Sequence, residues 1–283
     1  MTNKARWEWE INNKTNFWGN GLKELWLYRY LLAGLVRRHF LLNYQQTVLG
    51  PFWVLLQPVI TLIIYVVVFN KLVGISTETI PPVAFYASGI VLWNFFSESF
   101  TGTATTFRDN AQIFSKVYFP RIIMPLSVIS TYFMRFSLQL LLFLLILTYY
   151  HFFTTFEFRI TFWILALPIS VLFTGAIGLG MGLFFSVITA KYRDFINMIA
   201  VGVRLLMFIT PVIYPMIAIP EKARWIIQLN PLTPLFELFR LSLLNQGYVT
   251  PLQVAYSVTF SVLILLGSVL LFNKKGDKLI DII

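Results

Sequence analysis

Three ionisable side chains lie within long apolar runs, where a charge is costly and usually functional. They are Glu98 toward the end of the second run, Arg135 in the third and Arg204 in the fifth. If they face a polar interior, they could contact an anionic substrate or pair with one another. Long side chains near the end of a run could equally reach the membrane interface. The residue types leave both interpretations open.

The second apolar run combines aromatic side chains such as Tyr86, Trp93 and Phe96 with a hydroxyl-rich end, SESFTGTATTF. Aromatic rings could offer the apolar faces of sugars a surface to slide along, and hydroxyls could line a watery path. The same aromatic residues could instead face lipid or pack in a core. The hydroxyls could equally join neighbouring helices.

The sequence holds no motif for nucleotide hydrolysis or metal-dependent catalysis. Neither G-x-x-x-x-G-K-[ST] nor H-E-x-x-H occurs, the carboxylates are scattered, and there is no cysteine for a thiolate site. The glycines of TGAIGLGMG lie inside an apolar helix, so Gly178 and Gly182 predict a face for close helix packing rather than a dinucleotide loop. We expect no catalytic residue, metal or cofactor on this chain.

The elements that position these residues must be membrane helices. The 283 residues are 58% hydrophobic and 12% charged, with a mean hydropathy of +0.74, which is more apolar surface than a soluble fold could bury. A net charge of +10 would suggest nucleic acid as the partner of a soluble protein. Because these basic residues flank apolar runs, we expect membrane lipid and not nucleic acid.

Six runs approach the roughly 20 apolar residues that a spanning helix needs. They cover about residues 52–73, 83–103, 122–150, 161–189, 195–218 and 252–272. Basic residues concentrate in 1–51, 104–121, 190–194 and 273–283, so these segments and both termini are expected to be cytoplasmic. We predict an all-α polytopic membrane protein, with an N-terminal part over 1–50 and one six-helix domain over 51–283 that ends in a cytoplasmic tail.

Residues 22–46 precede the first span and mix tryptophan, tyrosine and leucine with arginine. This mixture is typical of a helix in the plane of the membrane interface, although a helix on a cytosolic partner would also have it.

The stretch 207–241 is apolar but contains five prolines and the charged cluster Glu221–Arg224. Proline removes a backbone donor and clashes with the preceding turn, so this is not one straight helix. Broken backbone at membrane depth is tolerated where protein buries it or where it lines a watery cavity. We predict that the fifth span ends near Met216 and that a re-entrant pair follows on the outer side, over about 221–229 and 234–243.

With these features in view, the chain resembles the polysaccharide-export permeases of ABC transporters, the O-antigen and teichoic-acid branch of the ABC-2 type. The resemblance covers nearly the whole chain and rests on the order and spacing of several blocks. They are QTVLGPFWVLLQP (46–58), ASGIVLWNFF (87–96), KVYFPR (116–121), KYRD (191–194), TPVIYP (210–215), PEKARW (220–225) and LNPLTP (229–234), with Glu237 and Arg240 beyond them.

The resemblance implies a homodimeric permease in the bacterial inner membrane, with two copies of a separate cytoplasmic subunit that binds ATP and Mg²⁺. Its substrate would be a polysaccharide on undecaprenyl pyrophosphate. The segment 22–46 would be the interface helix, about 104–121 the coupling helix, and about 219–243 an external gate.

Candidate residues follow from these assignments. For the lipid headgroup we expect Arg29, Arg37 and Arg38, because guanidinium groups suit phosphate oxygens. The chain departs from the family at the next positions, where members often carry basic residues and this chain has Asn43, Tyr44 and Gln45. Channel-lining candidates are Tyr86, Trp93, Phe96, Ser97, Glu98, Thr101 and Arg204. Coupling candidates are Arg108, Asp109, Gln112, Phe114 and Lys116. Gate candidates are Pro215, Pro220, Trp225, Pro231, Glu237 and Arg240.

Two other functions remain open on the sequence. One is an exporter of drugs or other small hydrophobic molecules with the same architecture, because a fold does not fix a substrate. The other is a membrane-embedded glycan-processing enzyme, against which the scattered carboxylates argue.

Overall fold

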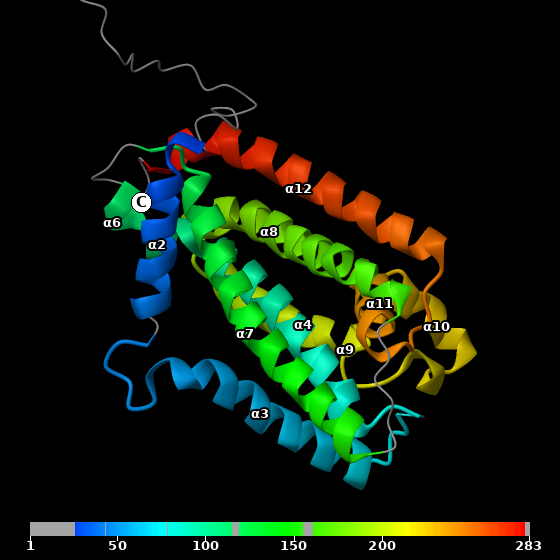
Figure 1. The fold of residues 1–283 in the computed structure, drawn as a ribbon. Helices are drawn as coiled ribbons and strands as arrows, with labels where there is room; N and C mark the ends of the chain where they lie inside the picture. The colour runs from blue at the N-terminus through cyan, green and yellow to red at the C-terminus, as the bar shows by residue number, and fades with distance from the viewer. Residues whose placement is uncertain (1–25, 43, 78, 115–118, 155–160, 281–283) are drawn as a thin grey trace, which may run out of the picture.

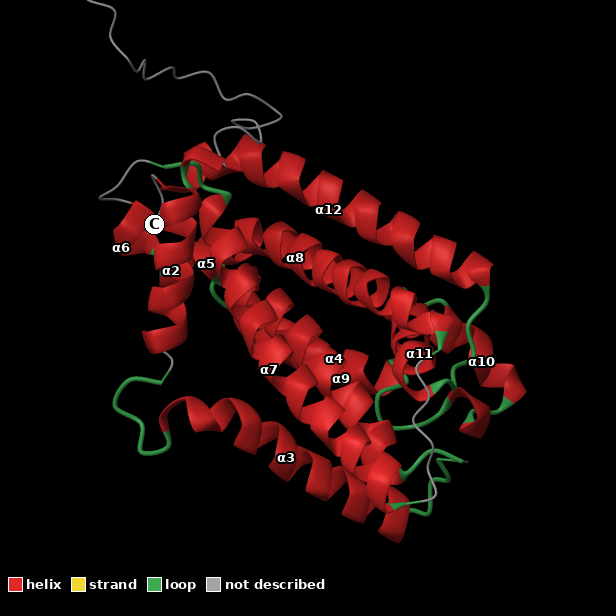
Figure 2. Ribbon diagram, viewed as in Figure 1, coloured by secondary structure: helices red, strands yellow, loops and turns green. Residues whose placement is uncertain are grey.

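The computed structural model describes residues 26–42, 44–77, 79–114, 119–154 and 161–280, and every regular element in these ranges is a helix (Figure 2). The longer helices are α2 (Arg29–Leu42), α3 (Trp53–Tyr65), α4 (Pro82–Ala104), α7 (Ile123–Phe153), α8 (Leu167–Lys191), α9 (Phe195–Ile209), α10 (Glu221–Gln228), α11 (Leu232–Leu244) and α12 (Pro251–Ile280). Shorter ones are α5 (Thr106–Asp109), α6 (Ala111–Phe114), η1 (Gly50–Phe52), the π-helix η2 (Val66–Leu72), η3 (Phe162–Ala166) and η4 (Met216–Ala218).

The long helices form a row in which each packs on the next (Figure 1). α8 lies between α12 and α4, α4 lies between α8 and α7, and α3 contacts both α4 and α7. α2 packs on α7 at one end of the long helices along their length, here called the α2 end, where α5 and α6 also lie. α10 and α11 lie at the opposite end, here called the α11 end (Figure 1).

The contact between α4 and α8 depends on the two glycines that were predicted to form a packing face. A Cβ atom on Gly178 would lie 3.0 Å from the Ser99 Cβ and 3.2 Å from the Phe96 carbonyl oxygen. A Cβ atom on Gly182 would overlap the Thr103 side chain. The prediction is confirmed, because any larger side chain here would push α8 away from α4.

A proline inside α3 explains a polar contact among α3, α4 and α7. Pro58 has no N–H group, so the carbonyl of Val54 four residues earlier lacks its helical donor. Gln139 on α7 donates its Nε2–H to that carbonyl at 3.4 Å, and its Oε1 accepts from Asn94 Nδ2 on α4 at 3.2 Å. One amide therefore satisfies the break in α3 and links three helices.

Four helical segments are long and apolar enough to cross a bilayer: Gly50–Leu72, Ile123–Phe153, Phe162–Lys191 and Pro251–Lys275. The other two predicted runs fold as α4, of 23 residues, and α9, of 15 residues. The predicted end of the fifth span near Met216 is wrong, because α9 stops at Ile209. Thr210 is extended (φ −98°, ψ 139°), as expected for a residue that precedes a proline.

Candidate functional site

The residues predicted to meet a headgroup lie on α2, which is held against the start of α7. Leu35 is buried on Phe119, Ile123 and Met124, and Arg37 and Arg38 point to the exposed side. Arg38 lines a cavity of about 230 Å³ between α2, α4, α5 and α7.

Arg29 lies near the beginning of α2, away from that cavity. Its Nη1 donates to the Trp26 carbonyl at 3.0 Å, and its guanidinium carbon lies 4.4 Å from the centre of the Tyr30 ring. The structure therefore places Arg38 beside a cavity and leaves Arg29 occupied by neighbouring aromatic residues.

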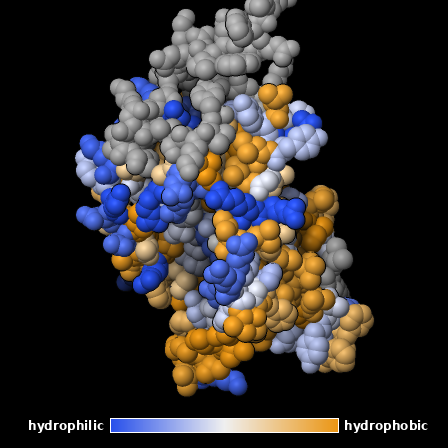
Figure 3. Space-filling view, turned by 90° about the vertical axis from the view of Figure 1, so that its left-hand side faces the viewer, coloured by the Kyte–Doolittle hydropathy of each residue, from blue (hydrophilic) through white to orange (hydrophobic). Residues whose placement is uncertain are grey.

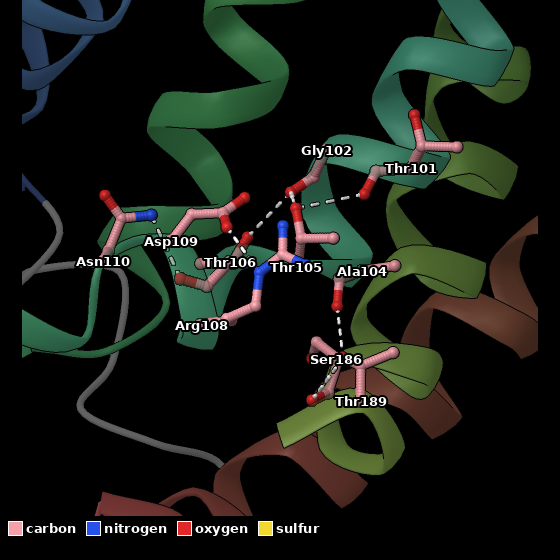
Figure 4. Close-up of polar contacts among 10 residues, drawn as sticks. All are labelled: Thr101, Gly102, Ala104, Thr105, Thr106, Arg108, Asp109, Asn110, Ser186 and Thr189. Atoms are coloured by element: carbon pink, nitrogen blue, oxygen red, sulfur yellow. Dashed lines mark hydrogen bonds and ion pairs between the residues drawn. The ribbon is translucent and has the colours of Figure 1, made fainter. Parts of the chain in front are cut away.

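The end of α4, the short helix α5 after it and the end of α8 form a tight polar unit (Figure 4). Thr106 Oγ1 donates to the Gly102 carbonyl at 3.3 Å, and Asn110 Nδ2 donates to the Thr106 carbonyl at 3.0 Å. Thr189 on α8 donates to the Ala104 carbonyl. These contacts fix the direction in which the chain leaves α4.

The predicted coupling residues lie in this unit and just beyond it. Arg108 and Asp109 form an exposed ion pair at 2.8 Å, and Gln112 is exposed on α6. The segment forms two short helices rather than one, because the chain bends at Asn110 (φ −120°, ψ 18°). Lys116 lies outside the described residues, and nothing is described of the Phe114 side chain.

A histidine links this unit to α2. His39 Nε2 and Asn110 Oδ1 are 3.3 Å apart, and Asn110 is buried. Burial lowers the pKa of His39, although its hydrogen bond with Asn110 acts in the opposite direction, and the nearby Arg38 lowers the pKa further. A neutral imidazole with its proton on Nε2 can donate to the Asn110 oxygen. The sequence analysis missed this contact, because the two residues are 71 positions apart.

Two of the three charges inside apolar runs pair with each other. Arg135 Nη2 lies 3.1 Å from Glu98 Oε1, with exposed side-chain fractions of 16% and 25%. The guanidinium carbon of Arg135 lies 5.8 Å from the Tyr132 ring centre and 6.0 Å from that of Tyr44. Arg204 lies on the exposed side of α9 and takes no part in this pair.

The aromatic candidates for a channel wall are buried inside this single chain. Tyr86 and Phe96 are fully buried and Trp93 is 7% exposed. The Trp93 ring packs on Phe96 and Phe236, with centre distances of 5.4 and 6.4 Å. That these rings line a channel stays a prediction.

The hydroxyl candidates are half-buried, and Thr101 donates to the carbonyl of Ser97 at 2.7 Å. Ser99 and Thr103 from the same stretch pack against the α8 glycines. Of the two interpretations left open for this stretch, the contact between helices holds for Ser99 and Thr103.

Two predicted gate residues form the most buried ion pair that the structure describes. Arg240 Nη1 donates to Glu237 Oε1 at 2.9 Å, and each side chain is only 3% exposed. Arg240 Nη2 donates to the Val212 carbonyl at 3.1 Å, and its guanidinium carbon lies 4.0 Å from the Phe85 ring centre. Glu237 Oε2 accepts the N–H of Tyr248 at 2.9 Å. The pair thus joins α11 to α4 and to the loops on either side of α10 and α11.

A glycine on α4 makes room for this pair. A Cβ atom on Gly89 would lie 2.5 Å from the Val212 oxygen and 3.3 Å from the Arg240 guanidinium. The sequence analysis did not select Gly89, because its role depends on a loop more than 100 residues away.

The predicted gate prolines mark breaks in the helices. Pro220 and Pro231 directly precede α10 and α11, and Pro215 precedes η4. Trp225 on α10 is 60% exposed. Asn230, which the sequence analysis missed, fixes the corner before α11, because its Nδ2 donates to Thr210 Oγ1 at 2.8 Å and its Oδ1 accepts the Leu232 N–H at 3.0 Å.

Within the described ranges, no group of three or more His, Cys, Asp or Glu side chains could hold a metal ion. Among the candidate residues, the described polar features are two buried or half-buried ion pairs, the exposed arginines of α2 and a cavity beside Arg38.

Comparison with known proteins assigns this arrangement to a family. The profile of the ABC-2 type transporter family matches residues 30–244. An "O-antigen export system permease protein RfbA" from Klebsiella pneumoniae is 26% identical over 257 residues, which cover 89% of this chain and 95% of the relative. A protein of the same name from Myxococcus xanthus is 30% identical over 217 residues, 76% of this chain and 80% of the relative. The chain is therefore a member of the ABC-2 type transporter family, a multi-pass membrane protein of the permease kind.

Proposed function

We propose that the chain is the membrane-spanning subunit of an ATP-driven exporter that moves a lipid-linked polysaccharide, such as O-antigen, out of the cytoplasm across the bacterial inner membrane. The observation that carries the proposal is the near full-length similarity to permeases named for O-antigen export. The substrate would be an undecaprenyl-pyrophosphate-linked glycan, and the permease would act as a homodimer.

Energy would come from two copies of a cytoplasmic ATP-binding partner, because this sequence contains no phosphate-binding loop of its own. The α2 end would face the cytoplasm, in agreement with the basic residues near it. Arg108, Asp109 and Gln112 would contact the partner, because they are exposed on the short segment that leaves α4. ATP and Mg²⁺ would be bound by the partner.

The His39–Asn110 contact suggests how movement of the partner reaches the substrate. Asn110 belongs to the unit that would touch the ATP-binding subunit, and His39 follows directly after Arg37 and Arg38 on α2. A shift of α5 and α6 would therefore move the two arginines. Both side chains are exposed, Arg38 beside the cavity of about 230 Å³, and their guanidinium groups would meet the phosphates of the lipid.

At the opposite end, α10 and α11 would form the external gate. The buried pair of Glu237 and Arg240 would hold α11 against α4, so that the gate moves as a unit instead of unwinding.

Deletion of the gene in its source organism tests this function. We expect lipid-linked glycan to accumulate on the cytoplasmic leaflet, and growth in the presence of hydrophobic toxins to stay normal. Normal surface glycan together with new toxin sensitivity would instead indicate a drug exporter. Loss of glycan synthesis, with no accumulated intermediate, would indicate a glycan-processing enzyme.

A further inference from the structure

A second cavity lies beside the ion pair of Glu98 and Arg135, and it has the chemistry of an anion site. Its volume is about 290 Å³, and it is lined by Tyr44, Trp53, Gln57 and Arg135. One molecule of liquid water occupies about 30 Å³, so a group of phosphate size fits. Trp53 and Gln57 are exposed, which leaves the cavity open on one side.

Two polar atoms of residues that line this cavity have no hydrogen-bond partner within the described part of the chain. They are the Tyr44 hydroxyl and Arg135 Nε, and both are withdrawn from solvent. Proteins rarely leave buried polar groups unpaired, and an unexplained case often indicates a ligand. Both groups can donate to an acceptor, and so can the amide of Gln57. The set matches an anion that is rich in oxygen atoms.

Among the described residues, Glu98 supplies the one ion-pair contact of Arg135, through Nη2 at 3.1 Å. A guanidinium carries five N–H donors in a planar fork that suits phosphate, so most of its donors remain for a ligand. In this conformation the Glu98 carboxylate binds Nη2 of Arg135, so a ligand oxygen would compete with Glu98 for that donor. A small rotation of Arg135 away from Glu98 would bring Nε toward the cavity.

The cavity lies nearer the α2 end of the membrane helices than the α11 end. Arg135 is 12 residues after the start of α7, about 18 Å along a helix of 31 residues, which is about 46 Å long. If α7 is centred on a hydrocarbon core about 30 Å thick, Arg135 lies about 10 Å inside the core, in the half nearer the α2 end. A phosphate must therefore leave the headgroup level to reach it. Tyr132 contacts Arg135 and also lines the cavity that contains Arg38, so the two cavities are neighbours.

The surface around α2 and the start of α3 supports an approach from this side. Figure 3 shows hydrophilic residues across the middle of this face, with hydrophobic residues among them, and mostly hydrophobic residues below. A charged headgroup could thus reach the cavity while its tail stays in the apolar region.

We propose that Arg135, Tyr44 and Gln57 form a binding site for the phosphate groups of a diphosphate-linked lipid, and that Glu98 occupies Arg135 while the site is empty. This inference rests on the proposed function for the identity of the lipid. It adds a site inside the transmembrane helices to the exposed arginines of α2. Release of Arg135 from Glu98 accompanies entry of the phosphate, so the ion pair competes with the substrate.

The test measures binding of a polyprenyl diphosphate to the complete exporter in nanodiscs of neutral lipid. Arg135→Lys keeps the charge and the pair with Glu98 but loses the fork, and we expect at least a tenfold weaker Kd. Tyr44→Phe removes one donor and should weaken the Kd about fivefold to tenfold. Glu98→Gln removes the competing carboxylate and should tighten binding. If the ion pair had only a structural role, Glu98→Gln would not tighten binding while Arg135→Lys weakens it.

Three controls identify the source of the anion. Lys71→Ala removes a cation at the far end of the segment Gly50–Leu72, which carries Trp53 and Gln57, and should leave the Kd unchanged. Polyprenol, which lacks phosphate, should bind no differently to wild type and Arg135→Lys. If inorganic diphosphate displaces the lipid from wild type, the site takes phosphate with or without a tail. If it does not, while Arg135→Lys still weakens lipid binding, the site takes only lipid-borne phosphate.

Unchanged lipid binding by both Arg135→Lys and Tyr44→Phe, or weaker lipid binding by Glu98→Gln, would refute the proposed phosphate-binding site. That result would leave the proposed function intact if the wild-type complex still exports glycan. Conversely, a wild-type complex that binds diphosphate through Arg135 but exports no glycan would refute the proposed function and keep the site.

Discussion

The buried pair of Glu237 and Arg240 offers a quantitative test of how α11 is held. Arg240→Met retains a long side chain but removes the donors to Glu237 (2.9 Å) and to the Val212 carbonyl (3.1 Å). With each side chain 3% exposed, solvent cannot replace these contacts. The Glu237 carboxylate would still accept the hydrogen bond from the Tyr248 N–H, but it would lose its cationic partner.

The loss of one partner from a buried ion pair costs about 3–5 kcal/mol in the free energy of unfolding. At about 1.4 kcal/mol for each factor of ten, the ratio of folded to unfolded protein falls by about a hundredfold or more. Equilibrium unfolding in mixed micelles with increasing dodecyl sulfate, followed by circular dichroism, measures this change. Arg108→Met is the matched control, because its pair with Asp109 is about half exposed and should contribute about 0–1 kcal/mol.

A double variant distinguishes an unpaired buried charge from simple loss of packing. Glu237→Leu combined with Arg240→Met leaves no charge behind, so it should recover a large part of the stability that the single variant loses. The reasoning is refuted if Arg240→Met costs less than about 1 kcal/mol, the upper value for an exposed pair. A double variant that is less stable than the single one would also refute it.

Three further predictions use other contacts. Gly182→Val should lower the free energy of unfolding by about 1–3 kcal/mol, because it separates α8 from α4. Gly267→Val, which has open space around it, should cost far less. Equal losses would contradict the packing argument. Gln139→Leu removes two hydrogen bonds between helices, each worth about 0.6 kcal/mol and at most about 1.7, so it should cost about 1 kcal/mol and at most about 3 in the same unfolding assay. No change would mean that the break in α3 needs no donor. Because burial lowers the pKa of His39 below its ordinary 6.5, protonation favours the unfolded state, so the stability it contributes is complete above that pH and declines as the pH falls through the folded-state pKa. Unfolding measured across this pH range should show a weaker decline for His39→Gln, and an identical decline would show that titration of His39 does not contribute to it.

Local patterns predicted most helices because their signals lie within a few residues. Prolines directly precede α10 and α11, whose observed bounds of Glu221–Gln228 and Leu232–Leu244 lie within a few residues of the predicted ones. Gly178 and Gly182 predicted the face of α8 because small residues four positions apart lie on one side of a helix.

The sequence predicted less about the site, because its contacts join distant segments. Arg240 reaches the carbonyl of Val212, a backbone atom that carries no sequence signal. Glu98 and Arg135 were candidates for pairing with each other, but only the fold could select this pair over Arg204. Tyr44 lies in a short loop after α2, and its place at the cavity depends on how α2 packs across α7.

The end of α9 was mispredicted for a different physical reason. Hydrophobicity continues past Ile209 through Val212 and Ile213, so a count of apolar residues extends the span. Backbone geometry at Thr210 and Pro211 ends the helix earlier, and the apolar residues that follow are buried against the protein.

Transport in reconstituted vesicles tests the central claim most directly. The chain and its ATP-binding partner, inserted together into liposomes that contain lipid-linked glycan, should move the glycan to the opposite leaflet when ATP and Mg²⁺ are supplied on the partner's side. A lectin that cannot cross the membrane reports the glycan on the far leaflet. The account predicts movement that requires ATP, Mg²⁺ and both subunits. Glycan movement without the partner, or its absence in a complex that hydrolyses ATP and exports a hydrophobic dye, would contradict it.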